Sequence, residues 1–405
     1  LRWWGGIPAE SGPQRVVESF NEEYKDKGIQ VEYERYVNDT EGNLKLDTSL
    51  MAGGDVDVYI TYGTSRLAQR VESDMAIDYT DLIERDGFDY EGLFGESVRS
   101  SYINGKPYSI STALSKAALL VNKDMFDAAG IEIPESWTFE EFREVCKKLT
   151  SGEGQDKVYG IFWNTQQNIY EYWTYLAQKS IGGNAYYNED GTETNFDDEV
   201  LQAAAKLVYD TMQDGTAPTH VDSVTQKLTQ EGLFLNGKVA MTIGNWIIRS
   251  VKNTEEYPHD FVTAYAPYPV YSEDAKYTQG TVANEVCINP KSENIEAAWE
   301  FVKWYSTGGM LPMAAGGTIP LCSAIDQDAV MAEFLTGMEN LVDIESAKEA
   351  VLPKEGEILT PDTITTSGEE IKKVLSEEVE AYFTGQKGLE EAFGDAKERA
   401  DEFLK

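Results

Sequence analysis

The chain has few histidines and cysteines, and it lacks a long apolar run. Its 405 residues include 2 histidines, His220 and His259, too few for an HExxH motif or a three-histidine zinc site. Both follow closely after a proline, and we expect both in surface loops. The 3 cysteines, Cys146, Cys287 and Cys322, form no CxxC motif and are expected to be buried free thiols. Without a run of about 18 apolar residues, no membrane span is expected.

Basic residues are scarce relative to acidic ones. The chain has 34 Lys and Arg against 71 Asp and Glu, a formal net charge of −37. A surface of this sign repels nucleic acids and anionic lipids and disfavours an anionic ligand. Phosphate-binding glycine motifs and the GxSxG elbow are also missing. We therefore expect no nucleic-acid partner, no metal and no cofactor, and a neutral polar ligand fits best.

The remaining pattern predicts an α/β protein with two domains, because the chain is too long for one core. Strands are expected at 1–4, 29–33 and 56–60, and helices at 13–25 and 44–51. This alternation predicts a mostly parallel sheet with crossover helices. Further along, the sequence predicts a short strand at 101–103, a helix that begins with a capping box at Thr138 and Glu141, and a helix capped by Asp198. It also predicts an amphipathic helix at 295–305. The C-terminal region at 369–403 is expected to be helical, with a break near Gly385 and Gly388.

Aromatic residues are abundant, with 8 Trp, 23 Tyr and 15 Phe, and several stand next to amides and carboxylates. Examples are Trp163-Asn164, Tyr170 to Trp173, and Asn245-Trp246. Sugars offer apolar faces to aromatic rings and hydroxyl groups to amides and carboxylates, so such pairs suit a sugar site. Core packing is the alternative, and for Trp173 both interpretations remain open.

Carboxylate pairs raise the alternative of a secreted glycoside hydrolase. Adjacent pairs such as Glu140-Glu141 point in different directions on a helix and are read as surface residues. A hydrolase needs two carboxylates that converge across a cleft, and residues distant in sequence could still supply them.

Several segments, taken in order, resemble family-1 extracellular solute-binding proteins that serve carbohydrate ABC transporters, such as the maltodextrin-binding protein. The chain departs from the usual family pattern where Val56 and Ser111 replace common prolines. The segments that carry the resemblance are 51–58, 104–126, 131–142, 234–246, 280–305 and 317–320.

The resemblance implies a two-lobed periplasmic-binding-protein type II fold, in which each lobe is a mixed sheet flanked by helices and hinge strands join the lobes. The implied N-terminal lobe is 1–113 and 280–325, and the C-terminal lobe is 114–279 and 326–405. It further implies a ligand held between the lobes and no catalytic residues. By the resemblance, Trp246 would stack on a sugar ring and Asn245 would reach its hydroxyl groups. Further ligand contacts are implied at Gly6, Glu10, Tyr62, Thr64, Ser65, Ser115, Lys116, Trp163, Asn164, Tyr170 and Glu285. The alternative for Glu285 is a hinge residue.

The expected function is that of an extracellular substrate-binding protein, not an enzyme. It would capture a neutral carbohydrate, with an oligosaccharide favoured, and deliver it to the membrane permease subunits of an ABC importer. We expect a monomer anchored as a lipoprotein, from a Gram-positive cell, with its signal and anchor segment removed or omitted from this chain. Receptors for a polyol, a phosphodiester or a peptide are alternatives.

Overall fold

The computed structural model describes residues 1–53, 56–166, 169, 171–182, 186–188, 190–244, 247–354, 359 and 367–405, apart from the side chain of Glu171. The chain divides into two compact units. Unit 1 comprises the described residues of Leu1–Ser115 and Thr281–Thr336, and unit 2 those of Lys116–Gly280, Gly337–Thr363 and Ser367–Lys405. The lobe boundaries expected from the sequence stay a prediction.

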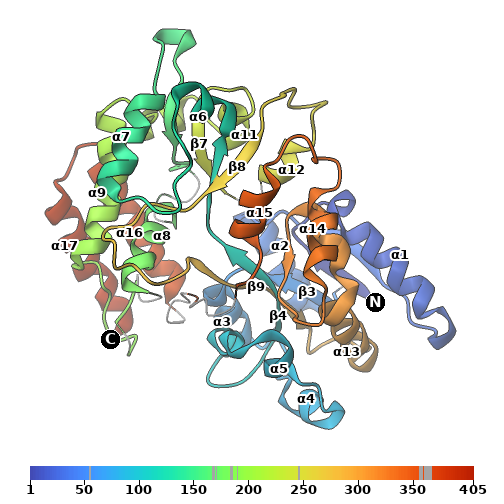
Figure 1. Cartoon of the computed structure of the whole chain (residues 1–405). Helices are drawn as coiled ribbons and strands as arrows, with labels where there is room; N and C mark the ends of the chain where they lie inside the picture. Colours follow the sequence, from blue (N-terminus) through green and yellow to red (C-terminus); the bar gives the residue numbers. More distant parts are fainter. Residues whose placement is uncertain are drawn as a thin grey trace. The chain divides into compact units, whose positions relative to one another are not determined.

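Unit 1 is built on a mixed sheet with the strand order β10-β4-β9-β3-β1-β2 (Figure 1). β1 pairs in parallel with β2 and with β3, whereas β3 and β9 are antiparallel, as are β10 and β4. The strands are β1 (Arg2–Gly5), β2 (Glu32–Arg35), β3 (Val58–Thr61), β4 (Ile110–Lys116), β9 (Gly280–Ile288) and β10 (Ile319–Pro320).

The two tryptophans of β1 show how this sheet is covered on both faces, since successive side chains of a strand point in opposite directions. Trp3 packs against Phe301 and Tyr305, with ring centroids 5.4 and 5.2 Å away. Trp4 belongs to the hydrophobic cluster on the other face. The helices of unit 1 are α1 (Pro13–Glu23), α2 (Thr40–Ala52), α3 (Thr64–Glu72), α4 (Thr80–Asp86), α5 (Tyr90–Phe94), α13 (Ile295–Trp304) and α14 (Gln327–Leu335).

The order of the first three strands creates a switch point. The chain moves from β1 to β2 on one side and then returns to β3 on the other side of β1. The loops that follow β1 and β3 therefore lead away in opposite directions, and open α/β sheets commonly bind their ligands outside the carboxyl ends of strands at such a point.

Unit 2 contains a smaller mixed sheet with the order β6-β7-β5-β8. β6 and β7 are parallel, and β5 is antiparallel to both of its neighbours. The strands are β5 (Leu119–Asn122), β6 (Tyr159–Phe162), β7 (Val239–Ile243) and β8 (Thr263–Ala266). The chain passes between the units within β4 and within β9, as expected for hinge strands.

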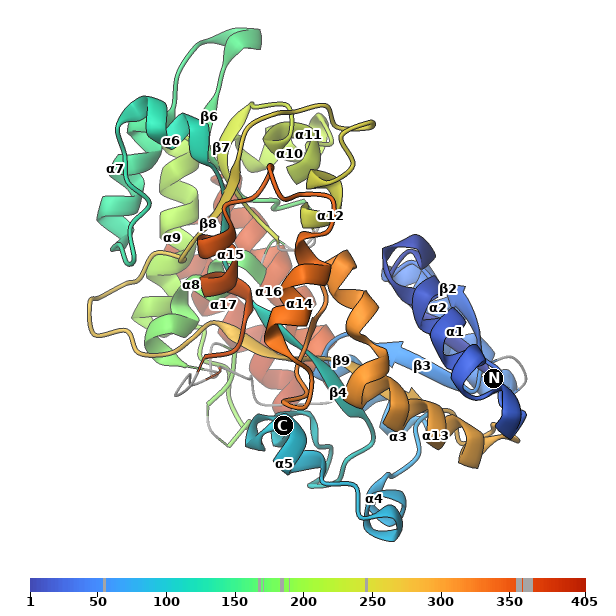
Figure 2. The same cartoon turned by 45° about the vertical axis from the view of Figure 1, so that its right-hand side comes forward.

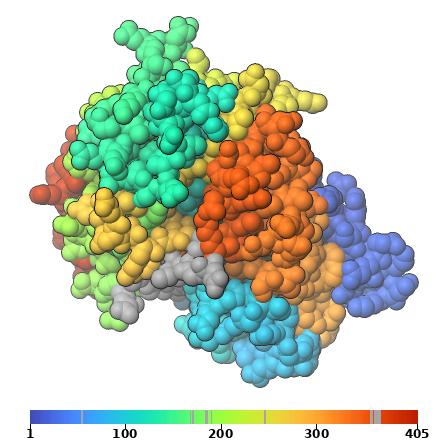
Figure 3. All heavy atoms as spheres, viewed as in Figure 1, coloured from blue at the N-terminus to red at the C-terminus, as the bar shows by residue number. Residues whose placement is uncertain are grey.

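Helices flank the unit 2 sheet, and α8, α9, α16 and α17 pack together (Figures 1 and 2). The teal segment around α6 and α7 forms part of the exposed surface of this unit (Figure 3). The helices are α6 (Lys123–Ala129), α7 (Phe139–Leu149), α8 (Glu171–Ile181), α9 (Glu199–Gln213), α10 (His220–Thr225), α11 (Gln230–Phe234), α12 (Ile248–Val251), α15 (Ile344–Val351), α16 (Gly368–Phe383) and α17 (Leu389–Asp401).

The predicted α/β fold with a mixed sheet in each lobe is confirmed, as are the Thr138 capping box and the Asp198 cap. The strand predicted at 101–103 is wrong: Ser101 ends a 3-10 helix, Glu96–Ser101, and Ile103 forms only an isolated bridge with Lys106. The prediction of a surface loop at His220 is also wrong: this residue begins α10 and is 5% exposed.

Candidate functional site

In unit 1, the carboxyl ends of β1 and β3 meet where two glycines lie against tyrosine rings. The Gly6 N–H donates to the hydroxyl of Tyr62 at 2.8 Å. A Cβ atom on Gly6 would lie 2.9 Å from the Tyr62 ring, and one on Gly5 would lie 2.9 Å from the Tyr33 hydroxyl. Glycine is therefore required for this close approach of backbone to ring. The arrangement brings together Gly6 and Tyr62, two of the residues predicted to bind ligand.

Two further tyrosines, which were not predicted from the sequence, hold the backbone at this end of the sheet by hydrogen bonds. Tyr33 donates its hydroxyl to the carbonyl of Ile7 at 2.6 Å, and Tyr36 donates to the carbonyl of Ile60 at 2.7 Å. Burial raises the pKa of both hydroxyls well above the usual range, so both remain protonated donors. The sequence signal for Tyr33 was its place in the alternating strand pattern, whereas Tyr36, which follows β2, had no such signal.

The turn between β3 and α3 carries the next predicted residues. Tyr62 is half-buried, and its ring centroid lies 6.3 Å from that of Tyr36. Thr64 and Ser65 form the first turn of α3 and are also half-buried. Glu10 lies exposed in the short 3-10 helix Ala9–Ser11 that follows β1. This edge thus offers an aromatic ring, two hydroxyl groups and a free carboxylate.

A buried arginine anchors the same turn to the helices behind it. Arg70 of α3 is 2% exposed. Its guanidinium donates to Asp47 at 2.8 Å and to Asn43 at 2.9 Å, both on α2, and also to the Thr61 hydroxyl at the end of β3. A fully buried guanidinium needs such partners, so the cluster holds β3, α2 and α3 in one arrangement.

Glu285 stands beside this turn, because β9 pairs with β3 so that Glu285 lies opposite Thr61. The residue is 1% exposed, and among the described residues its Oε2 atom has no hydrogen-bond partner. Burial raises the pKa of the carboxyl group to about 7, while backbone hydrogen bonds with Glu285 itself and with Gly63 oppose the rise. Buried, incompletely paired carboxyl groups are found preferentially at functional sites.

In unit 2, the loops after the parallel strands β6 and β7 leave the same edge of the sheet. Trp163 and Asn164 follow β6 directly. Trp163 is 1% exposed; its indole N–H donates to the Thr211 hydroxyl at 3.0 Å, and its ring lies 5.8 Å from Phe142. Trp163 is therefore part of the hydrophobic core.

A polar layer behind this edge was not predicted. Asn164 is fully buried and donates its Nδ2 to Gln230 at 2.6 Å. The Thr165 hydroxyl and Nδ1 of His220 are 2.9 Å apart. Burial lowers the pKa of His220, although Glu380 nearby opposes this effect. The loop after β6 is thus held by residues of α10 and α11.

The other predicted contacts in this part of the chain have different surroundings. Trp173 is 1% exposed, donates its indole N–H to the carbonyl of Ile169 at 2.7 Å and packs against Phe393. Lys116 is 7% exposed and donates to the carbonyl of Leu352 at 2.9 Å, whereas Ser115, the last residue of unit 1, is exposed on β4. Asn245, Trp246 and Tyr170 lie outside the described residues. The ligand roles of all these residues stay predictions.

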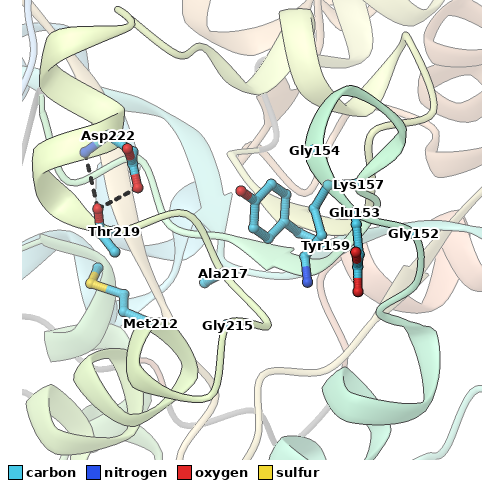
Figure 4. A pocket seen from close by; sticks show the side chains of 10 residues that line it. All are labelled: Gly152, Glu153, Gly154, Lys157, Tyr159, Met212, Gly215, Ala217, Thr219 and Asp222. Carbon is cyan, nitrogen blue, oxygen red and sulfur yellow. Dashed lines mark hydrogen bonds between the residues drawn. The ribbon is translucent and has the colours of Figure 1, made fainter.

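A surface hollow of about 420 Å³ lies elsewhere in unit 2 (Figure 4). Tyr159 at the amino end of β6 lies on one side, and Thr219 and Asp222, joined by hydrogen bonds, lie on the other. The predicted ligand-binding residues follow the carboxyl end of β6, so this hollow is at the opposite edge of the sheet. It is not the site that the sequence predicted.

Membrane-spanning helices and metal sites each have a recognisable structure. In the described part of the chain, no helix has the length and apolar character needed to cross a membrane. The same residues contain no group of three or more His, Cys, Asp or Glu side chains placed to hold a metal ion.

Comparison with known proteins adds to this geometry. The family model for bacterial extracellular solute-binding proteins matches residues 7–308. A binding protein of Brucella abortus (strain 2308) is 28% identical over 350 residues, which are 79% of this chain and 79% of that protein. The maltotriose-binding protein of Pyrococcus abyssi is 28% identical over 207 residues, which are 50% of this chain and 41% of that protein.

Solved structures share the fold. The ABC substrate-binding protein Lmo0181 of Listeria monocytogenes, in complex with cycloalternan, aligns with 100% of this chain and 98% of its own, with a TM-score of 0.79 and 21% identity. At that identity the similarity demonstrates the fold alone. The family model, by contrast, covers most of the sequence. This chain belongs to the family of bacterial extracellular solute-binding proteins.

Proposed function

We propose that this chain is the substrate-binding protein of an ABC importer and that it binds a neutral carbohydrate, with an oligosaccharide favoured. The observation that carries this proposal is the turn after β3, where the half-buried Tyr62 is followed closely in the chain by the half-buried Thr64 and Ser65. A ring for the apolar face of a sugar, beside groups that bind hydroxyls, is the chemistry that carbohydrate recognition needs.

Charge and the comparisons support the same choice. The net charge of −37 disfavours an anionic ligand such as a phosphodiester. One relative is named for binding maltotriose, and one structural neighbour was solved with cycloalternan, an oligosaccharide in both cases. A polyol and a peptide are the remaining alternatives, and the same experiment can detect them.

Binding without catalysis is part of the proposal. Glycoside hydrolysis uses two carboxylates on either side of the scissile bond. The predicted ligand residues here are mostly aromatic, hydroxyl and amide groups. Of the two predicted carboxylates, Glu285 is 1% exposed within β9, whereas Glu10 is exposed in a 3-10 helix. We further propose a monomeric, extracellular protein, anchored as a lipoprotein on a Gram-positive cell, which delivers its ligand to the membrane permease subunits of the importer.

A thermal-shift screen tests the ligand class. The panel is maltose, maltotriose, a cyclic glucan, a xylo-oligosaccharide, ribitol, a glycerophosphodiester and a tripeptide. A carbohydrate present at a hundredfold excess over Kd stabilises the folded state by about 2.7 kcal/mol, which raises Tm. A shift with only ribitol, the phosphodiester or the tripeptide would overturn the carbohydrate proposal, and release of shorter sugars from an oligosaccharide would overturn binding without catalysis.

Variants tie the shift to the predicted residues. We expect Tyr62→Ala and Trp246→Ala each to weaken the carbohydrate-dependent shift strongly. The matched control is Tyr271→Ala, which removes a tyrosine ring that is 39% exposed on unit 2 and should leave the shift unchanged. Equal effects of all three variants would mean that the shift does not arise from the predicted site.

A further inference from the structure

The carboxyl group of Glu285 is unusual because it is buried and only partly paired. It is 1% exposed, and its Oε2 atom has no hydrogen-bond partner among the described residues. Burying such a group destabilises the folded protein unless hydrogen bonds compensate. A residue that lowers stability within β9, opposite the last residue of β3 and beside predicted ligand-binding groups, is more simply explained by function than by folding.

Among the described residues, this carboxyl group forms a hydrogen bond with the turn that carries the predicted site. It forms a backbone hydrogen bond with Gly63, and since a carboxylate can only accept, the donor is the Gly63 N–H. Gly63 is the N-cap of α3, has a φ of 98° and, as a glycine, supplies no side-chain cap to the helix. Glu285 therefore holds the backbone at the N-cap position of α3 from a neighbouring strand, between Tyr62 and Thr64.

The backbone next to Glu285 is strained as well. Asn284 has a φ of 56°, a conformation that residues other than glycine seldom adopt. Its carbonyl accepts a hydrogen bond from the Thr112 hydroxyl of β4 at 3.0 Å. Strain of this kind is concentrated in ligand clamps and switch regions. Two neighbouring residues of β9 are therefore unusual: Asn284 in its backbone conformation and Glu285 in its buried, partly paired carboxyl group.

The protonation state of Glu285 changes the strength of the hydrogen bond with Gly63. An ionised carboxylate forms shorter and stronger hydrogen bonds with N–H donors than a neutral carboxyl group does. The amino end of α3 also favours negative charge. Burial acts in the other direction and raises the pKa to about 7, so both forms are populated near neutral pH.

We propose that Glu285 is a positioning residue for ligand binding: its ionised carboxylate holds the β3–α3 turn in the binding arrangement, and ligand binding releases its proton to the solvent. This inference rests on the proposed function, because it needs a carbohydrate that binds next to Tyr62, Thr64 and Ser65. A ligand that binds one protonation state better must shift the population toward that state. Carbohydrate affinity should therefore rise with pH across neutrality.

Few other groups around Glu285 titrate in this range. Burial raises the pKa of Cys287 to about 12 and that of Tyr59 well above its usual value. Arg70 stays charged. Between Ile110 and Ser115, β4 contains no titratable side chain. The titratable groups on the described elements packed around Glu285 are Tyr59 and Tyr62 at β3, Cys287 on β9, Lys116 at the end of β4, Arg66, Arg70 and Glu72 on α3, and also Tyr79 and Tyr305.

Calorimetric titration tests the proposal with the panel carbohydrate that gives the largest thermal shift. Binding is measured at pH 7 in two buffers with different heats of ionisation, and Kd is measured at pH 6 and pH 8. We expect net proton release and tighter binding at pH 8, by about tenfold for each unit by which the ligand lowers the pKa. Glu285→Gln should abolish both effects, and Glu285→Asp, which keeps a carboxyl group, should retain a pH dependence.

A second buried carboxyl group provides the matched control. Glu378 on α16 is 5% exposed but is paired with Lys387 and Arg399. Glu378→Gln should leave proton release unchanged. If the wild type binds carbohydrate without proton release, or if Glu285→Gln keeps the same pH dependence, the role of Glu285 is overturned while the proposed function stands. If no carbohydrate binds, the proposed function fails and the linkage fails with it.

Discussion

The two sheet edges hold their aromatic side chains in opposite ways. At the unit 1 edge, Tyr62 is half-buried, and its hydroxyl is fixed by the N–H of Gly6. At the unit 2 edge, Trp163 is 1% exposed, and its N–H is satisfied by Thr211 of the long helix α9. One ring is therefore accessible to a ligand, and the other is an element of the core.

This difference teaches that an aromatic residue next to a polar one can serve either purpose. Gly5 and Gly6 leave room for tyrosine rings beside the backbone. Only a few residues separate β1 and β3 from the helices that follow them. In unit 2, Phe142 of α7 lies against Trp163, and Phe393 of α17 lies against Trp173. The helices that cover the strand end decide which role the ring takes.

The largest effect that would sharpen this contrast is expected for Trp163→Ala. Removing a fully buried indole leaves a cavity and one hydrogen bond fewer at the Thr211 hydroxyl, which still donates to the carbonyl of Val208. Core substitutions of this size lower the free energy of unfolding by about 3–5 kcal/mol. Urea denaturation measures the loss. Tyr271→Ala, at a ring that is 39% exposed, should change the free energy by only about 0.5 kcal/mol. Similar losses for both variants would contradict the core assignment of Trp163.

The next effect concerns Glu285→Gln at the unit 1 edge. The pKa of the carboxyl group is about 7 in the folded protein against a reference value of 4.5. The folded state therefore binds the proton more tightly, so the stability from this group is fully present below pH 4.5 and is lost as pH rises through 7. Glutamine stays neutral, and at pH 8 the variant should be more stable than the wild type by up to about 3 kcal/mol.

Chemical denaturation from pH 5 to pH 8.5 checks this prediction. The difference between variant and wild type should shrink steadily toward pH 5. A constant difference at all pH values would mean that Glu285 does not titrate in this range and that the variant changes packing instead.

Gly6→Ala should break the close approach of backbone and ring. The new Cβ atom would lie 2.9 Å from a Tyr62 ring carbon, so the ring must move. Overpacking of this kind lowers the free energy of unfolding by about 1–3 kcal/mol. We also expect carbohydrate affinity to fall about tenfold, as if 1.4 kcal/mol of binding free energy were lost. Thermal unfolding and calorimetric titration measure the two effects.

The control for this substitution is a glycine with free space around it. Gly394 lies within α17, and a Cβ atom there would meet nothing within 4 Å. Gly394→Ala should raise stability by about 0.5–1 kcal/mol through helix propensity and leave affinity unchanged. Full affinity in Gly6→Ala would remove this edge from the ligand site.

The smallest effect is expected for Lys179→Met in unit 2. Burial lowers the pKa of this lysine from 10.5 to about 8, and its Nζ donates to the carbonyl of Tyr268 at 3.3 Å. The folded state therefore favours the neutral amine, so stability from this group is present above pH 10.5 and is lost as pH falls through 8. At pH 7 the variant should gain about 1 kcal/mol after allowance for solvent screening.

The sign of the pH dependence separates the two buried groups. The gain in Lys179→Met should shrink above pH 8, whereas the gain in Glu285→Gln should grow up to that pH. Denaturation curves at pH 6, 8 and 9.5 measure both. The same slope in both variants would contradict the assignment of opposite pKa shifts to the two units.

Much of the fold could be predicted because it depends on local patterns. The alternation of strands and helices over the first 60 residues predicted parallel pairing, which β1, β2 and β3 show. The Thr138 capping box and the Asp198 cap depend on residues close together in sequence. The strand predicted at 101–103 was wrong because Ser101 ends a 3-10 helix and Ile103 forms only an isolated bridge. A segment this short contains no sequence pattern that distinguishes a strand from a 3-10 helix.

The candidate site was predicted less completely. Gly6 and Tyr62 are 56 positions apart, yet the parallel pairing of β1 and β3 brings them into a hydrogen bond. Tyr33, Tyr36 and Arg70 were missed because each supports the turn from another element. His220 was expected at the surface, but its contact with Thr165 arises only because α10 packs on the loop after β6.

The sequence by itself determined the local elements, the acidic charge and the membership of a solute-binding family, because these depend on composition and on motifs read along the chain. The tertiary structure decided which aromatic rings are buried, which glycines must stay bare and why Glu285 is both enclosed and incompletely paired. Those properties depend on which side chains meet across strands and helices, and burial and pKa follow from that environment. The difference between Tyr62 at an accessible turn and Trp163 in a core has this origin.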